Sequence, residues 1–358
     1  MNKSAKIYVA GHKGLVGSAI WKGLQEKGYT NLVGRTSAEL DLRDGPATAR
    51  FFQEEKPDYV VLSAARVGGI VANNIYRADF IHDNLAIQQN VIESSYQSGV
   101  TKLLFLGSTC IYPKDAPQPI KEDYLLTGPL EITNEPYAIA KIAGIKSTES
   151  FNLQYGTNFI SAMPTNLYGP HDNFDLEKSH VLPAMVRKFL LGSWLRNDDW
   201  DAIRQDLDHR PVEGYTGACA KEDMLAVLAK YGITPDAVEI WGTGKPLREF
   251  LWSEDLADAC IFLLENVDFE DLRTDSAQMR NFHINIGTGQ EIAIADLARL
   301  IREKTGYTGD IIFNTTKPDG TLRKLTDTSK IHRLGWKHTV EISEGVSRII
   351  EWYLTARS

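Results

Sequence analysis

Tyr137 and Lys141 stand four residues apart in the segment EPYAIAKIAG, residues 135–144. In a helix this spacing places both side chains on one face, one turn apart. A tyrosine hydroxyl has an ordinary pKa of about 10, and an adjacent ammonium lowers that pKa because it favours the phenolate. The pair therefore predicts an acid–base group for neutral pH. A structural interpretation is also open, in which the tyrosine packs and the lysine extends to solvent.

Polar residues follow an apolar run upstream of this pair. The run KLLFLG, residues 102–107, is typical of a buried strand, and Ser108, Thr109 and Cys110 come directly after it. A serine hydroxyl at such a strand end can hold a carbonyl oxygen. A lone cysteine there is usually a small hydrophobe.

A glycine-rich turn comes near the start of the chain. Gly11, Gly14 and Gly17 follow the apolar run IYVA and precede an amphipathic run. A turn this tight needs residues without a Cβ, and the third glycine lets the helix lie against a sheet. Because a helix N-terminus offers backbone N–H groups to phosphates, the pattern predicts a dinucleotide-binding turn.

Strands and helices alternate after this turn. The segments NLVGRT and DYVVLSAA predict strands at 31–36 and 58–65, and helices are expected at 45–57, with Pro46 in the first turn, and at 83–99. This alternation indicates an α/β fold, a Rossmann-type doubly wound parallel sheet. Ligands of such sheets bind beyond the carboxyl ends of the strands. We therefore expect Ser108, Tyr137 and Lys141 to converge on the nicotinamide of a dinucleotide.

The end of the second strand indicates which dinucleotide. Enzymes that use NAD usually place Asp or Glu there to hold the ribose 2′-hydroxyl. This chain has Arg35 instead, with no acid before Glu39, and Lys13 lies in the glycine turn. Two cations suit a 2′-phosphate, so NADP (as NADPH) is the predicted cofactor. Two solvated surface cations are the alternative.

Longer segments resemble one family. The glycine turn, the strand-end serine and the Y-x-x-x-K helix are similar to the extended short-chain dehydrogenase/reductase superfamily. Within it the chain resembles the GDP-L-fucose synthase family. The similar segments run in order along nearly the whole chain: AGHKGLVGSAI, ARVGGIVANN, LLFLGSTCIYPK, TNEPYAIAKIAGIK, MPTNLYGPHDNF, SHVLPAM and KPDGTLRKL.

The resemblance implies a two-stage reaction. A member of this family converts GDP-4-keto-6-deoxy-D-mannose to GDP-L-fucose, by epimerisation at C3 and C5 followed by reduction of the C4 ketone with NADPH. It implies that Tyr137 and Lys141 serve hydride transfer and that Ser108 holds the keto oxygen. Cys110 and His180 would be the proton-transfer pair, because protons beside a ketone are acidified by enolate formation.

The resemblance also implies binding residues. Cofactor contacts are expected at Gly11, Lys13, Gly14, Gly17, Arg35, Ala65, Lys141, Pro164, Asn166, Leu167 and His180. The nucleotide sugar is expected at Lys188, Trp241, Arg248 and Asp319. Arg248 is favoured most, since a guanidinium fork suits a diphosphate.

The βα rhythm breaks after MPTNLYGPHDN, near residue 173. We therefore expect an NADP-binding domain over 1–172 and a smaller C-terminal α/β substrate domain over 173–358, with segments near 249–290 packing back on the first domain. In the second half, Ser253 is expected to cap a helix whose apolar face includes Cys260.

Two features depart from the family pattern. Ser37 occupies a position where members often carry a second basic residue, which weakens the preference for NADP. A segment of about 190–237, here called the inserted segment, is longer than the usual connection and contains a helix-like run KEDMLAVLAKYG. It predicts a surface subdomain, a lid or an oligomer contact. Cys219 inside it receives no role.

Composition limits the possible partners. The chain has 358 residues, 43% hydrophobic and 24% charged, with a net charge of −8, which argues against nucleic acid. Its three cysteines lack metal-ligand spacing, so reduced thiols and no metal are expected. We find neither a membrane-length apolar run nor a signal-peptide pattern, and we expect a cytoplasmic protein without a membrane partner.

Rival functions stay open at this point. Another NAD(P)-dependent nucleotide-sugar enzyme, a 4-epimerase or a 4,6-dehydratase, would share the fold and the Tyr–Lys pair. A 4,6-dehydratase should place acids after Ser-Thr, where this chain has Cys110 and Ile111. A non-catalytic NADP-sensing protein is a further alternative. A homodimer is expected by analogy, through long helices around 84–98 and 137–154.

Overall fold

The computed structural model describes residues 1–274 and 279–356. The chain forms two compact units. The first unit consists of Met1–Leu167, Glu249–Gln290 and Leu325–Thr339, and the second of Tyr168–Arg248, Glu291–Lys324 and Val340–Ser358. The segment near 249–290 is thus grouped with the first unit, although residues 275–278 within it lie outside the described part.

A six-stranded parallel sheet forms the centre of the first unit, in the order β2-β1-β3-β4-β5-β10. The strand order reverses between β1 and β3, where doubly wound sheets bind ligands. This arrangement confirms the Rossmann-type parallel sheet expected from the sequence. The strands are β1 (Ile7–Ala10), β2 (Leu32–Val33), β3 (Tyr59–Leu62), β4 (Lys102–Leu106), β5 (Phe159–Pro164) and β10 (Ile284–Ile286).

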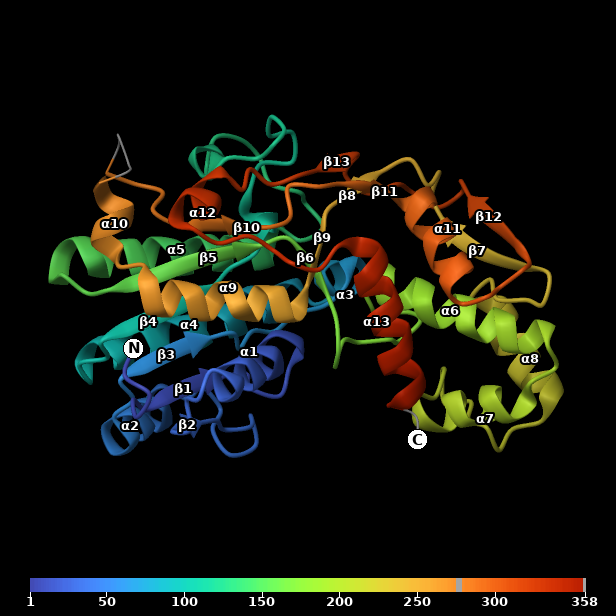
Figure 1. Cartoon of the computed structure of the whole chain (residues 1–358), viewed down its shortest axis with the longest axis horizontal. Helices are drawn as coiled ribbons and strands as arrows, with labels where there is room; N and C mark the ends of the chain where they lie inside the picture. The colour runs from blue at the N-terminus through green and yellow to red at the C-terminus, as the bar shows by residue number, and fades with distance from the viewer. Residues whose placement is uncertain (275–278, 357–358) are drawn as a thin grey trace. The chain divides into compact units, whose positions relative to one another are not determined.

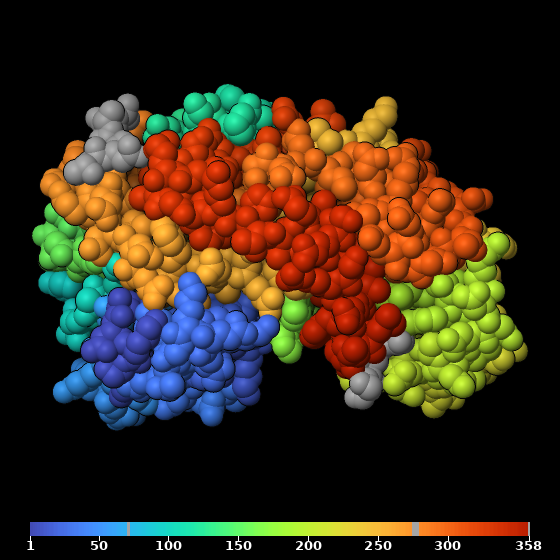
Figure 2. Space-filling view, in the orientation of Figure 1, coloured from blue at the N-terminus to red at the C-terminus, as the bar shows by residue number. Residues whose placement is uncertain are grey.

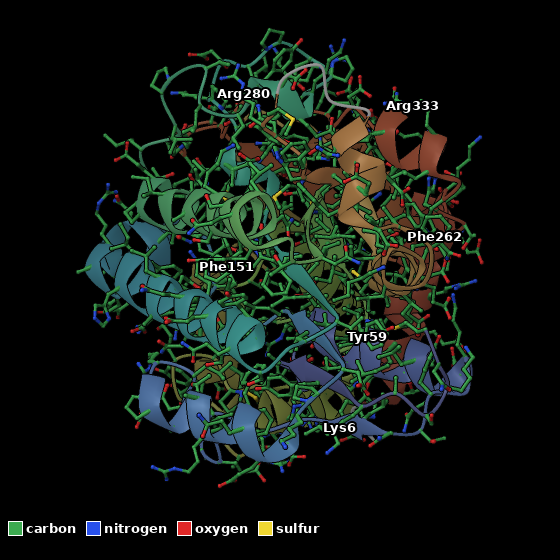
Figure 3. All side chains as sticks on the ribbon, turned by 90° about the vertical axis from the view of Figure 1, so that its left-hand side faces the viewer. Lys6, Tyr59, Phe151, Phe262, Arg280 and Arg333 are labelled. Atoms are coloured by element: carbon green, nitrogen blue, oxygen red, sulfur yellow. The ribbon has the colours of Figure 1, made fainter. Side chains whose placement is uncertain are left out.

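Helices cover both faces of this sheet because alternate strand residues point to opposite sides. Ile7 and Val9 of β1 pack in a core with α1 (Leu15–Glu26) and α9 (Ser253–Asn266). The other face packs against α2 (Gly45–Glu55), α4 (Arg77–Gln97) and α5 (Glu135–Tyr155). Figure 1 shows α9 in front of the strands. In the side view, Phe151 of α5 and Phe262 of α9 lie on opposite sides of the strand residue Tyr59 (Figure 3).

The first unit is assembled from distant parts of the chain. On the face shown in Figure 2, the residues of α9 lie between those of the N-terminal segment and those of α12 (Ser329–Leu334). A fully buried carboxylate, Glu249, joins these parts. It accepts hydrogen bonds from the backbone N–H groups of Thr288 and Gly289, both at 2.7 Å, and of Thr326 at 3.0 Å.

The second unit is a smaller α/β arrangement. Strand β7 (Ala237–Trp241) pairs in parallel with β12 (Asp310–Asn314). A three-stranded sheet contains β8 (Leu247–Arg248) between β11 (Ile292–Ala293) and β13 (Arg323–Lys324). The unit's longer helices are α6 (Val181–Arg196), α11 (Ile294–Lys304) and α13 (Ile342–Thr355).

The inserted segment forms its own small core on α6. Its helices α7 (Trp200–His209) and α8 (Lys221–Lys230) bury Ile203 and Leu228 with Leu191 and Leu195 of α6. The expected helix in KEDMLAVLAKYG is confirmed.

The remaining α-helices and strands of the described residues are α3 (Ile70–Ile75), β6 (Asn166–Tyr168), β9 (Phe250–Trp252) and α10 (Phe269–Thr274).

The capping role expected for Ser253 is wrong. Helix α9 begins at Ser253 itself, with Trp252 in the capping position, and no side chain caps the helix. The reason is that Ser253 already has helical backbone and its hydroxyl is buried. Cys260, in contrast, is fully buried in the core of the first unit, as expected. None of the described helices is both long enough and apolar enough to cross a membrane.

Candidate active site

The carboxyl end of β4 carries the first group of candidate residues. Ser108 follows the strand in extended backbone, and its hydroxyl oxygen accepts a hydrogen bond from the N–H of Cys110 at 3.3 Å. This bond starts a single 3₁₀ turn, Thr109–Ile111, in which Thr109 and Cys110 are buried while Ser108 stays partly exposed. The turn therefore holds a hydroxyl and a thiol at the strand end where a ligand of this fold binds.

Tyr137 and Lys141 lie in the first two turns of α5, on one face as their spacing predicts. The ammonium nitrogen of Lys141 is 5.8 Å from the centre of the Tyr137 ring. It donates a hydrogen bond to the carbonyl oxygen of Leu106 at 2.8 Å, which ties α5 to the end of β4. Phe80 packs edge-on against the tyrosine ring. The structure thus brings Ser108, Cys110, Tyr137 and Lys141 to one place.

The electrostatics of this pair differ from the sequence-based expectation. Burial raises the pKa of Tyr137 well above its usual value of 10, whereas the expectation was a lowered pKa. Burial also lowers the pKa of Lys141 from 10.5 to about 8, against an opposing effect of the Cys110 thiol. The physical reason is that Lys141 is 97% buried and gives its hydrogen bond to a backbone carbonyl, so desolvation is the largest effect on the pKa of both groups.

The glycine turn fits a dinucleotide pyrophosphate. Gly11 has a positive φ of 84°, and a Cβ on Gly17 would lie 2.1 Å from the carbonyl oxygen of Gly11, so no other residue fits there. Gly14 occupies the capping position of α1, no side chain caps that helix, and the nearest atom to an added Cβ is 3.5 Å away. The N-terminus of α1 is thus open to an anion.

Arg35 lies beyond β2 with its guanidinium paired to a carboxylate. Its Nη2 is 2.6 Å from an oxygen of Glu55, and its Nη1 donates to the carbonyl of Gly34. Glu55 lies 20 residues away in α2, and its pairing with Arg35 was not predicted from the sequence. Lys13 is exposed in the glycine turn, whereas the guanidinium of Arg35 already has Glu55 as its partner.

The remaining expected cofactor positions follow strand ends of the first unit. Ala65 is partly exposed three residues beyond β3, and Pro164 is the buried last residue of β5. Asn166 and Leu167 are partly exposed in β6. The amide of Asn166 donates to the carbonyl oxygen of Glu249 at 2.8 Å, so its side chain also has a structural partner.

In the second unit, His180 and Lys188 are both placed by α6. His180 is exposed in the capping position of this helix. Lys188 lies two turns further along, is buried, and donates to the carbonyl oxygen of Glu239 in β7 at 3.0 Å. Burial lowers its pKa from 10.5 to about 8.

Trp241, Arg248 and Asp319 surround the turn between β7 and β8. The Trp241 ring is 57% exposed. Asp319 accepts hydrogen bonds from the N–H and hydroxyl of Thr243 at 2.8 and 2.7 Å, which lower the pKa of its carboxyl group. Arg248 donates through Nη1 to the carbonyl of Leu247, and burial lowers the pKa of its guanidinium.

Three groups that contact the expected site residues were not predicted from the sequence. The ammonium of Lys317 lies 5.3 Å from the centre of the Trp241 ring, and Thr243 fixes the Asp319 carboxylate. Lys317 lies two residues before Asp319, so its positive charge next to an expected binding residue could have identified it. The carbonyl of Leu106 could not be recognised from the sequence, because every residue has a backbone carbonyl that can accept a hydrogen bond.

A comparison with family models decides the relationship. The model of the NAD dependent epimerase/dehydratase family matches residues 7–208 and 217–287. The chain belongs to this family. The matched residues include the glycine turn and the group at the end of β4, as expected from the resemblance to extended short-chain dehydrogenases/reductases.

Family members with high identity span the chain almost completely. GDP-L-fucose synthase 1 of Arabidopsis thaliana is 51% identical over 353 residues, which cover 99% of this chain and 94% of that protein. Among solved structures, a GDP-6-OMe-4-keto-L-xylo-heptose reductase from C. jejuni is 47% identical with a TM-score of 0.93. A GDP-D-glycero-L-gluco-heptose synthase from Campylobacter jejuni, solved in the presence of NADPH, is 46% identical with a TM-score of 0.92. Each of these two covers 99% of both chains.

Proposed function

We propose that this protein is an NADPH-dependent epimerase and reductase that converts GDP-4-keto-6-deoxy-D-mannose to GDP-L-fucose. The observation that carries the proposal is the group Ser108, Cys110, Tyr137 and Lys141 at the end of β4, at the same edge of the parallel sheet as a turn that fits a dinucleotide. The 51% identity to a GDP-L-fucose synthase supports the substrate.

In the reduction step, Tyr137 donates its hydroxyl proton to the C4 oxygen of the sugar. A high pKa suits this role, because the hydroxyl keeps its proton until the developing alkoxide takes it. NADPH, when bound, supplies the hydride. Ser108 donates a hydrogen bond to the same oxygen, and Lys141 holds the helix that carries Tyr137 against the end of β4.

In the epimerisation step, Cys110 and His180 exchange protons at C3 and C5. Removal of a proton next to the C4 ketone gives an enolate, whose charge rests on the oxygen that Ser108 and Tyr137 hold. The same two hydroxyls therefore stabilise both steps. A thiol and an imidazole suit this exchange, because their ordinary pKa values of about 8.5 and 6.5 lie near neutrality.

Lys188 and Arg248 bind the diphosphate of the nucleotide sugar. A buried lysine with a pKa of about 8 becomes fully charged when two phosphates lie beside it, because an adjacent negative charge raises that pKa again. Trp241 offers a half-exposed aromatic face, and Asp319 offers a carboxylate held by Thr243.

All the proposed cofactor contacts except His180 lie in the first unit. Gly11, Gly14 and Gly17 receive the pyrophosphate, and Arg35 with Lys13 receives the 2′-phosphate. The relative solved in the presence of NADPH supports this assignment. Ala65, Pro164, Asn166, Leu167 and His180 remain proposed cofactor contacts.

A second candidate is reduction of a GDP-bound 4-keto-heptose. The two Campylobacter relatives that are named for heptoses match the fold with TM-scores of 0.93 and 0.92. A heptose and a 6-deoxyhexose share the GDP group and the C4 ketone, so they call for the same chemistry at Tyr137. They differ in the substituent at C5.

One experiment tests both candidates. The protein is incubated with NADPH and either GDP-4-keto-6-deoxy-D-mannose or a GDP-4-keto-heptose, and cofactor absorbance and product stereochemistry are recorded. Stoichiometric NADPH oxidation with GDP-L-fucose as product supports the main proposal. Turnover of the heptose alone supports the second, and no NADPH oxidation with either would contradict both.

We also propose a homodimer formed through α4 and α5 and a cytoplasmic location. Ile139, Leu153 and Tyr155 of α5 and Tyr96 of α4 are between 39% and 48% exposed, which is high for large apolar side chains on neighbouring helices. Phe151 links this surface to the unit through ring contacts with Tyr96 and Tyr155.

The proposed cytoplasmic location rests on the cofactor and on the expected reduced thiols, and cell fractionation tests it.

A further inference from the structure

We propose that the inserted segment positions His180 and Lys188, and that Asp206 of α7 is the residue through which it acts. The inference rests on the proposed function, which gives His180 and Lys188 their roles. Asp206 and its partner Arg187 are positioning residues, since they act through α6 and the loop before it. Every contact in the argument lies within the second unit.

A buried ion pair joins the inserted segment to α6. Arg187 of α6 is 1% exposed and Asp206 is fully buried. The guanidinium Nε and Nη2 atoms both donate to the same carboxylate oxygen of Asp206, at 3.0 and 2.9 Å. Removing one member of a buried ion pair strongly destabilises the folded protein, because the other charge is left buried without a partner.

The same guanidinium holds the loop that leads to His180. Its Nη1 donates to the carbonyl oxygen of Phe174 at 3.2 Å, and Nη2 donates to the carbonyl of Arg210. Phe174 lies six residues before His180 and is 99% buried. Leu176, further along this loop, packs on the core of the inserted segment. Arg187 thus joins α6, the loop and the end of α7 through one planar group.

The C-terminal helix completes the arrangement. The hydroxyl of Tyr353 in α13 donates to the second carboxylate oxygen of Asp206. The centres of the Phe174 and Tyr353 rings lie 4.6 Å apart. The guanidinium of Arg210, a residue of the inserted segment, lies 4.7 Å from the centre of the Tyr353 ring. Figure 1 shows the end of α13 beside α7. Asp206 therefore joins α6, α7 and α13, and its partner Arg187 adds the loop at Phe174.

This arrangement fixes two residues of the proposed site. Lys188 is the neighbour of Arg187 in α6, and His180 occupies the capping position of the same helix. Because a guanidinium donates in one plane and in fixed directions, the ion pair sets the rotation of α6 as apolar packing alone would not. A rotation of α6 would move the Lys188 ammonium away from its partner, the Glu239 carbonyl.

The inserted segment is thus a brace behind α6. A lid would need few buried contacts, so that it could open. Its helices α7 and α8 instead bury Ile203, Leu207, Met224 and Leu228 against Leu191 of α6. This packing favours a permanent support over the lid that the sequence also allowed.

The test is Asp206→Asn in the full-length protein. This change keeps the size of the side chain and removes the charge that pairs with Arg187. The matched control is Asp236→Asn, which removes the same charge in the same segment. Asp236 is paired with Arg196 at 3.4 Å, but its side chain is 94% exposed. The measurements are made well below the melting temperature of each variant, with circular dichroism as the check on folding.

Three readouts separate positioning from general stability. We expect Asp206→Asn to weaken binding of GDP, measured by calorimetry, and to raise the KM for the keto sugar, each about 10-fold. Deuterium exchange from heavy water into the sugar should fall by a similar factor. The Kd for NADPH should stay within about twofold, because His180 is the one proposed cofactor contact in the second unit and all the others lie in the first unit. Asp236→Asn should match the wild type in every readout.

A second variant keeps the proposal falsifiable if Asp206→Asn does not fold. The double variant Arg187→Met and Asp206→Leu replaces the pair by apolar side chains of similar size, a change that buried pairs often tolerate. It loses the bond to the Phe174 carbonyl, so we expect weak GDP binding in a folded protein. Wild-type GDP affinity and exchange in either folded variant would overturn the inference. If the wild type neither binds GDP nor exchanges, the proposed function fails instead.

Discussion

The ammonium of Lys141 donates to the carbonyl oxygen of Leu106 at 2.8 Å. This bond couples helix α5, which carries Tyr137, to the last residue of β4, two positions before Ser108. Lys141 therefore serves the site first as a positional link. Its ammonium nitrogen lies at a greater distance from Tyr137, 5.8 Å from the ring centre.

The buried position of Lys141 predicts a pH-dependent stability. Its pKa falls from 10.5 to about 8 on folding, so between these values the unfolded chain binds more protons and stability rises with pH. Lys141→Met should remove this slope. Relative to the variant, the wild type should gain about 2 kcal/mol of unfolding free energy from about pH 7.5 to about pH 9.5. Urea titrations at both pH values measure this difference, and equal slopes would show that the lysine is solvated.

Replacing Tyr137 by phenylalanine should abolish the reduction. The variant keeps the ring that packs against Phe80 and loses only the proton donor. We expect kcat for NADPH oxidation to fall by about 10²–10⁴, with the Kd for NADPH unchanged. Tyr96→Phe, on the surface of α4, is the control. A loss below about tenfold would assign Tyr137 a structural role.

The pairing of Arg35 with Glu55 predicts opposite effects of two substitutions. Arg35→Ala should lower kcat/KM for NADPH by about 10-fold to 100-fold, because one charge-assisted bond to the 2′-phosphate is lost. Glu55→Gln should raise kcat/KM for NADPH, since the carboxylate no longer competes for the guanidinium. NADH kinetics should change little in both. Equal use of the two cofactors by the wild type would contradict the assignment and point to Ser37.

Epimerisation should depend on Cys110 and His180 without any hydride transfer. With oxidised cofactor, the wild type should exchange deuterium from heavy water into the keto sugar. In Cys110→Ser a thiol with an ordinary pKa of about 8.5 is replaced by a much weaker acid, so exchange should collapse. With NADPH this variant should slowly give a GDP-6-deoxyhexose that is not L-fucose. His180→Gln should also impair exchange, and Cys219→Ser is the matched thiol control. Normal GDP-L-fucose from Cys110→Ser would make Cys110 a core thiol only.

The proposed dimer surface can be tested with one charge. Leu153→Arg places a cation on an α5 residue that is 45% exposed, and it should halve the mass measured by light scattering at micromolar concentration. Leu225→Arg, on a residue of the inserted segment that is 38% exposed, should leave the mass unchanged. A monomeric wild type would refute the dimer.

The sequence predicted the parts of the site that follow from chain periodicity. The Gly11–Gly17 turn, the strand before Ser108 and the shared face of Tyr137 and Lys141 are local patterns, and the structure confirms each. The pKa of Tyr137 was predicted in the wrong direction because burial depends on neighbours that are distant in the sequence. The desolvation of the site comes from the packing of whole elements, which no spacing of residue types reveals.

The sequence also did not predict the ion-pair partners that lie on other helices and strands. Glu55 in α2 binds Arg35, and Asp206 binds Arg187 from a segment that is longer than the usual connection of the family. Pairs of opposite charge are common in any sequence, so nothing distinguishes the pairs that meet in the fold. The failure at Ser253 has another cause, since a shift of one residue in the start of a helix turns a capping serine into a helical one.

The way Glu249 joins distant segments has a consequence for synthesis on the ribosome. Helix α9, which packs with α1 on one face of the sheet, is complete only when residue 266 has been made, and the carboxylate lacks its Thr326 partner until the last tenth of the chain emerges. At about 5–20 residues per second, the first strand has α1 early but waits many seconds for α9. The nascent chain therefore keeps part of this apolar sheet face exposed for most of its translation. We expect it to need chaperone protection, and a fragment that ends near residue 172 should aggregate.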